Sequence, residues 1–121
     1  MAMRIQLDKV YYGVILEFRP NDPLGVSNTV VELLPRRRRE AYARALQEVP
    51  EPIDRASDKL LYGTREEALQ AARILRGVAD RVSIQQLQRR NDMETETVYG
   101  LAGFLTASGH QYVPISVREP V

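Results

Sequence analysis

The chain has 121 residues and no cysteine, which is enough sequence for one domain with its own core and excludes disulfides and thiol catalysis. Its 17 basic and 16 acidic side chains give a net charge of +1, which disfavours a protein that coats nucleic acid. No apolar run reaches the roughly 18 residues that span a bilayer, and Met1–Phe18 lacks the apolar core of a signal peptide. We therefore expect a cytoplasmic protein with no membrane partner.

The N-terminal part is dominated by one alternating segment. Val10–Phe18 has apolar residues at every second position, which is the period of a half-buried strand. Its other face is only half polar, so we expect a central strand or one with a partner on that side. Arg4–Leu7 predicts a short strand before it, and the alternation changes parity near Asp8, which predicts a bulge or tight turn.

The next segment, Arg19–Ser27, is rich in Pro, Gly, Asn and Asp and predicts a loop. The residues at 29–34 fit either a β-branched strand or a short capped helix. Pro35 favours extended geometry before it and a helix after it, so we predict a strand at 29–34 and a helix at about 36–48. The buried stripe of that helix consists of Ala41, Tyr42, Ala45, Leu46 and Val49.

The clearest unit of the chain is Asp58–Leu87, which predicts a strand, a helix and a strand in succession. Leu60–Tyr62 is a short apolar run. Thr64 and Glu67 have the spacing of a capping box, in which both side chains bond free N–H groups at the helix start. The helix has one apolar stripe and Val82–Gln85 alternates, so we expect two parallel strands with a right-handed crossover. The stripe consists of Ala68, Ala71, Ala72, Leu75 and Ala79.

The last third is less regular. Thr95–Ser108 has apolar residues at helical spacing and ends at a glycine, which predicts a third helix; a strand through Thr97–Leu105 is the alternative. Tyr112–Val117 predicts a final strand, and Pro114 places it at an edge or a bulge. We expect Glu119–Val121 to fray.

This order of elements predicts a single α+β domain over residues 1–121. We expect one mixed β-sheet with about three helices packed mainly on one face, containing a βαβ unit at about 58–87.

Few residues in this chain are suited to catalysis. His110 is the only histidine and follows a predicted helix end, where the dipole favours a cation. No phosphate-binding loop, dinucleotide fingerprint or zinc-protease motif occurs. Asp92, Glu94 and Glu96 have the chemistry of a Mg²⁺ site, although the dipole also favours acids at a helix start. We therefore predict a non-enzymatic protein with no cofactor and no metal, and this carboxylate site is the enzymatic alternative.

The sharpest anomaly is the run Arg36–Arg39 at the start of a predicted helix, where the dipole disfavours each cation by roughly a few tenths of a kcal/mol. We interpret it as a binding surface that Arg44 extends and that Arg89 and Arg90 join if the fold places them nearby. The candidate binding residues are Arg36, Arg37, Arg38, Arg39, Arg44, Arg89 and Arg90. Three interpretations stay open: contact with an acidic protein surface, contact with phosphates, or a solvated face neutralised by carboxylates.

The function that these observations favour is a small non-enzymatic cytosolic binding protein that acts through protein–protein contacts. It would serve as an accessory factor or inhibitor, of the kind found in bacteria, phages and mobile elements. The alternative is a nucleic-acid-binding protein that uses Arg36–Arg39. A homodimer formed through edge strands near Tyr112–Val117 is a further arrangement that the sequence allows.

Overall fold

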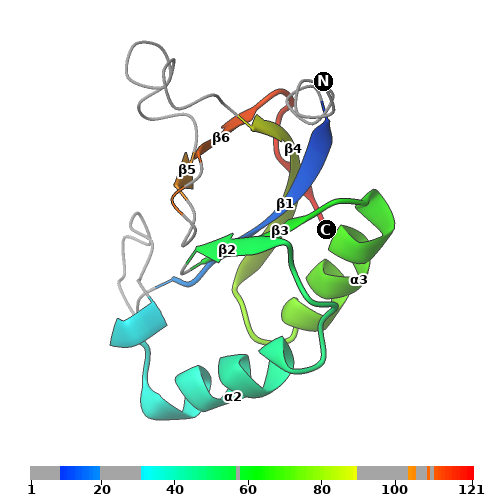
Figure 1. The fold of residues 1–121 in the computed structure, drawn as a ribbon. Coiled ribbons are helices and arrows are strands. Elements are labelled where there is room, and N and C mark those ends of the chain that lie inside the picture. The colour runs from blue at the N-terminus through cyan, green and yellow to red at the C-terminus, as the bar shows by residue number, and fades with distance from the viewer. Residues whose placement is uncertain (1–8, 20–30, 57, 90–103, 106–108, 110) are drawn as a thin grey trace.

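The computed structural model describes residues 9–19, 31–56, 58–89, 104–105, 109 and 111–121. These residues form seven strands, two α-helices and one 3-10 helix (Figure 1). In chain order the elements are β1 (Val10–Glu17), η1 (Val31–Leu33), α2 (Arg36–Leu46), β2 (Asp54–Ala56), β3 (Lys59–Tyr62), α3 (Arg65–Leu75), β4 (Arg81–Arg89), β5 (Phe104–Leu105), β6 (Gln111–Pro114) and β7 (Glu119–Pro120).

All seven strands belong to one sheet, in the order β2-β3-β1-β4-β6-β5, with β7 also pairing with β4. Every pairing among them is antiparallel, so the prediction of a mixed sheet was wrong. The physical reason is that β3 and β4 run in the same direction but are not neighbours, because β1 lies between them and pairs with both. The predicted βαβ unit is present, but the N-terminal strand splits it.

β1 is the central strand of this sheet, as its sequence predicted. Its even-numbered residues face the helices, and Val14 and Leu16 are fully buried there. The opposite face is also covered, since Tyr11 and Ile15 are buried. The half-polar second face of this strand therefore indicates a position between neighbours rather than exposure to solvent.

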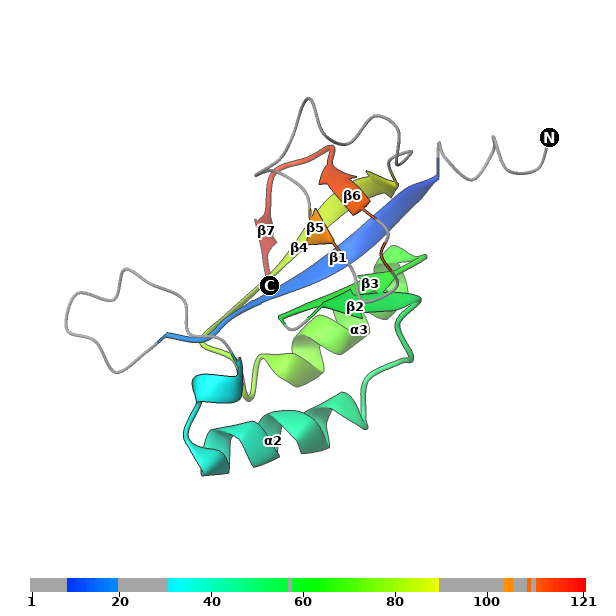
Figure 2. The same ribbon diagram turned by 60° about the vertical axis from the view of Figure 1, so that its left-hand side comes forward.

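α3 is the helix that packs directly on the sheet, against β1, β3 and β4, whereas α2 packs on α3 (Figure 2). Four of the five residues of its predicted stripe are buried, and the fifth, Ala79, is half-buried beyond the end of the helix. The Thr64 hydroxyl oxygen accepts a hydrogen bond from the backbone N–H of Glu67 at 3.3 Å, as the capping box predicts. The second bond differs from the prediction, because the Glu67 carboxylate accepts from the Thr64 hydroxyl at 2.8 Å.

The segment before α2 departs from the prediction of a strand at 29–34. Val31–Leu33 forms a 3-10 turn, and the backbone N–H of Leu34 donates to the carbonyl of Val31 at 3.1 Å. Pro35, with φ −54° and ψ 146°, is extended and begins α2, which confirms the helix predicted after it. The strand prediction rested on β-branched residues, whose preference for strands depends on packing against a neighbouring strand. A 3-10 turn of three residues needs no such neighbour.

A second core lies on the face of the sheet opposite α2 and α3. It consists of Tyr11, Leu61, Leu87 and Tyr112. The rings of Tyr11 and Tyr112 meet edge to face with centroids 5.4 Å apart, although β4 separates their strands. Partial burial raises the pKa of Tyr112, and the charge of Asp54 on β2 raises it further. The contact between the Tyr11 and Tyr112 rings across the intervening β4 indicates a sheet that curls around the second core.

The C-terminal segment is ordered along β4, so the prediction that Glu119–Val121 frays was wrong. β7 pairs Glu119 with Ile84, and the backbone N–H of Val121 donates to Val82 at 3.0 Å. The predicted third helix is also wrong where the structure describes it, because Phe104–Leu105 is a strand paired with β6. The remainder of that predicted helix, the strand at Arg4–Leu7, the bulge near Asp8 and most of the loop at 19–27 lie outside the described residues.

Candidate functional site

α2 carries five arginines and one glutamate among its eleven residues, with no acidic residue in its first turn and no side-chain cap. Two of the five arginines are held by carboxylates of the same chain. Arg36 Nε lies 2.9 Å from Glu40 Oε1 in an exposed pair one helical turn apart, and such a pair contributes only about 0.3–0.5 kcal/mol. Arg36 is therefore partly neutralised without being fixed in place.

Arg38 has a structural contact that the sequence did not reveal. Its guanidinium donates to Asp80 Oδ2 at 2.8 Å and lies 5.8 Å from the centre of the Phe18 ring. The same carboxylate oxygen accepts the backbone N–H of Arg19 at 2.6 Å. Asp80 thus joins the start of α2, the end of β1 and the turn after α3. Arg38 is therefore held by contacts within the fold, with 34% of its side chain exposed.

The pKa of Asp80 reports the same contacts. Partial burial raises this pKa, but the hydrogen bonds and charges of Arg38 and Arg19 lower it by more. The net direction is down, so the carboxylate is ionised at neutral pH. Tyr42 also anchors α2, because its ring meets that of Phe18 edge to face with centroids 5.2 Å apart. Burial, with the charge of Asp58, raises the pKa of Tyr42 to about 12.

Arg37, Arg39 and Arg44 form the exposed set, which we call the arginine surface. All three are exposed, and none has an ion pair with another residue in the described ranges. Arg37 and Arg44 are seven residues apart, which places them on one side of the helix about 10 Å apart along its axis. Arg39 projects on the other flank. α2 therefore presents three exposed cations that are in no ion pair with another described residue.

The surroundings of the arginine surface contain both charge signs and one apolar side chain. Glu32 and Glu48 are exposed just before and just after α2, and Glu40 lies within it. Leu33 in η1 has 75% of its surface exposed, immediately before the helix. Sequence reasoning missed Leu33, because it assigned that residue to a strand.

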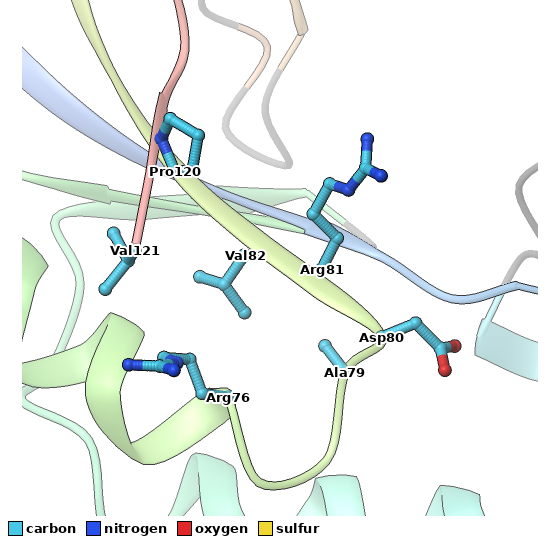
Figure 3. A pocket seen from close by; sticks show the side chains of 7 residues that line it. All are labelled: Arg76, Ala79, Asp80, Arg81, Val82, Pro120 and Val121. Carbon is cyan, nitrogen blue, oxygen red and sulfur yellow. The ribbon is translucent and has the colours of Figure 1, made fainter.

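The structure does not bring the remaining predicted binding residues to α2. β4 begins at Arg81, directly after Asp80 (Figure 3), which contacts Arg38 of α2. Arg89 is the last residue of β4, eight residues after Arg81. An extended strand of that length places Arg89 roughly 26 Å from the α2 end of β4. Figure 1 shows the C-terminal end of β4 beside β6, far from α2. Arg89 therefore cannot join the arginine surface, and Arg90 lies outside the described residues.

The residues considered for catalysis are not placed by the structure. His110, Asp92, Glu94 and Glu96 all lie outside the described residues. Within the described part of the chain, no group of three or more His, Asp or Glu side chains is arranged to hold a metal ion. Nor does that part contain a helix with the length and apolar character needed to cross a membrane. The comparisons with protein-family models, with curated proteins and with solved structures found no match to this chain.

Proposed function

We propose that this protein is a non-enzymatic binding module whose contact surface is the outer face of α2, and that its partner is a protein with an acidic surface. The observation that carries the proposal is the arginine surface. Arg37, Arg39 and Arg44 are exposed cations at or after a helix N-terminus, with no carboxylate bound to them among the described residues. The dipole opposes Arg37 and Arg39, which lie in the first turn of α2, and favours Arg44, which lies in its last turn.

Charge spacing favours a protein partner over nucleic acid. A phosphate backbone is a continuous line of negative charge, and its binding requires a continuous positive track. Along α2 the cations are interrupted by Glu40 and flanked by Glu32 and Glu48, all exposed. A protein surface with separate carboxylates accommodates this alternation, because each charge meets its own counterpart.

Leu33 supports the same choice. Interfaces between proteins combine a central apolar contact with a charged rim. An exposed leucine directly before the arginine surface supplies that apolar element. Nucleic-acid backbones offer little apolar surface for such a side chain.

The test compares wild type with an Arg37/Arg39/Arg44→Gln variant. A matched control removes the same charge elsewhere, as Arg73/Arg76/Arg118→Gln, since these arginines are also exposed and outside the ion pairs of the described residues. Each protein is immobilised and exposed to native lysate with and without nuclease. Partners are identified by mass spectrometry, purified, and titrated by calorimetry.

The expected result is an acidic protein that is retained after nuclease treatment. Its Kd should rise about 5- to 150-fold in the Arg37/Arg39/Arg44→Gln variant, as expected for three exposed charge contacts, and stay unchanged in the control. An equal loss of affinity in both variants would mean that only net charge matters, and would reject the arginine surface as the contact site. Retention that nuclease abolishes, with affinity falling steeply with salt, would instead show the nucleic-acid alternative.

A further inference from the structure

α2 lies at the periphery of the molecule, with α3 on its inner side (Figures 1 and 2). Its outer side carries charges of both signs in a regular order, which we call the charge stripe. The stripe continues past the helix to Glu48, because the backbone N–H of Glu48 donates to the carbonyl of Ala45 at 3.0 Å and extends the last turn. Its members are all exposed and follow one another at a spacing that places them on one side of a helix. They are Arg36, Arg37, Glu40, Arg44 and Glu48.

The charge stripe is complementary to a second copy of itself. From the N-terminal end its signs run basic, acidic, basic, acidic, so a copy that runs in the opposite direction presents acidic, basic, acidic, basic at the same levels. When Glu40 of one copy faces Arg44 of the other, Arg36 and Arg37 of the first copy lie level with Glu48 of the second. Two-fold symmetry repeats every contact, because residue i meets residue j and residue j meets residue i. Antiparallel pairing therefore neutralises the stripe along its whole length.

Other symmetric arrangements of the two helices bring like charges together. In a parallel symmetric pair each residue faces its own counterpart, so Arg44 faces Arg44 and Glu40 faces Glu40. An antiparallel pair that is shifted by one helical turn also places one of these two residues opposite itself. Like charges that face each other oppose association, so the stripe specifies one direction and one register.

The antiparallel pair also places the arginines where a helix dipole favours them. Within one chain the dipole disfavours Arg36 and Arg37 at the start of α2, whereas the C-terminal end of the second copy, which lies beside them, favours cations. Glu40 has an oxygen for a second guanidinium, since Arg36 contacts it only through Oε1 and it has no other ion pair with a described residue. Ala43 is exposed between Glu40 and Arg44, and its small side chain allows the two helices to approach closely.

We infer that two copies of this protein associate through α2 in antiparallel orientation, with Arg44 of each copy bound to Glu40 of the other. All the charged contacts are exposed, so the dimer is weak and dissociates at high salt. The dimer does not depend on the proposed acidic partner. Both contacts use Arg37 and Arg44, however, so a partner that binds the arginine surface competes with the second copy.

Sedimentation equilibrium of the purified full chain tests this dimer. Wild type should be partly dimeric at about 1 mM protein and low salt, and monomeric at about 0.5 M salt. Glu40→Arg and Arg44→Glu should each raise the dissociation constant at least about tenfold, because each substitution makes a contact like-charged in both halves of the dimer. Glu40→Arg removes no cation from the arginine surface, so it should weaken the dimer without weakening the binding of an acidic partner. The dimer and the proposed function can therefore fail separately.

An exchange of the two charges completes the test. Glu40→Arg/Arg44→Glu should restore the wild-type dissociation constant, because the facing residues are again oppositely charged in the antiparallel register. Arg73→Glu changes the net charge as Arg44→Glu does, but it lies exposed on α3 and should leave the dimer unchanged. Far-UV circular dichroism shows that each variant is folded. A wild type that is monomeric throughout, a dimer that Glu40→Arg leaves intact, equal weakening by Arg73→Glu, or a folded exchange variant as weak as the single ones would overturn the proposal.

Discussion

At the scale of single residues, Asp80 binds one arginine of the run Arg36–Arg39 and leaves its neighbours exposed. One carboxylate oxygen takes two hydrogen bonds from residues 42 and 61 positions away in the chain. It thereby separates Arg38, which belongs to the fold, from the neighbouring arginines, which stay exposed. The four arginines of the run therefore have different structural surroundings.

Asp80→Asn should lower the free energy of unfolding by about 1 kcal/mol at neutral pH, a figure already reduced for solvent screening of a partly exposed pair. The folded pKa lies below the ordinary value of this carboxyl, so the ionised form stabilises the fold above about pH 4. That contribution is lost as pH falls below about 4 and through the folded pKa. Urea unfolding followed by circular dichroism measures both effects.

In that experiment wild type and the Asp80→Asn variant should converge in acid. The control is Glu51→Gln, an exposed carboxylate, which should leave unfolding unchanged at neutral pH. A difference between wild type and Asp80→Asn that stays constant into acid would mean that the charge of Asp80 does not hold α2.

At the scale of elements, the C-terminal strands β6 and β7 both pair with β4, although each of them ends in a proline. Ile115 and Val121 donate their N–H groups to Gln86 and Val82. Pro114 and Pro120 each precede one of these donors, so their nitrogens face away from β4 and cost no ladder hydrogen bond. The register changes by two residues between Leu87–Pro114 and Ile84–Glu119, which is a bulge. The sequence predicted either an edge or a bulge at Pro114 and a strand that continues to Val117, whereas β6 ends at Pro114.

Ser116 compensates for this bulge, because its hydroxyl accepts the backbone N–H of Gln86 at 3.0 Å where the ladder has no carbonyl in place. Ser116→Ala should therefore lower the free energy of unfolding by about 1 kcal/mol, since it leaves a partly buried donor unpaired. Val117→Ala, next to it and 84% exposed, should change it by less than about 0.5 kcal/mol. Thermal unfolding compares the two, and an equal effect would refute the compensating bond.

At the scale of the whole molecule, one sheet supports two separate cores. The larger core lies between the sheet and the helices and includes Leu16, Ile84 and Leu75. The smaller one lies inside the curl on the other face and includes Leu61 and Leu87, both fully buried. The free energy of folding therefore depends on both faces, although among the described residues only one face carries helices.

Leu87→Ala should cost about 2–5 kcal/mol of unfolding free energy, close to the cost of Leu75→Ala in the larger core, because each removes a fully buried side chain. Leu33→Ala is the control, since that residue is 75% exposed and should cost under about 0.5 kcal/mol. Chemical denaturation measures all three. A small cost for Leu87→Ala would mean that the second face does not contribute a core.

The sequence by itself determined the elements whose signal is local. β1, α3 and β4 follow from apolar periodicity, and α2 follows from Pro35 and the stripe after it. Each of these depends on residues within about two helical turns, so its physical basis is present in a short window of sequence.

Only the tertiary structure decided which elements and charges meet. The insertion of β1 between β3 and β4, the pairing of β7 and the Arg38–Asp80 contact all join residues more than thirty positions apart. No local period encodes such contacts, because they depend on how the sheet buries both its faces. For the same reason the predicted arginine set is not one cluster in the structure. Arg38 is paired with Asp80, and Arg89 lies at the end of β4 that is far from α2 (Figure 1).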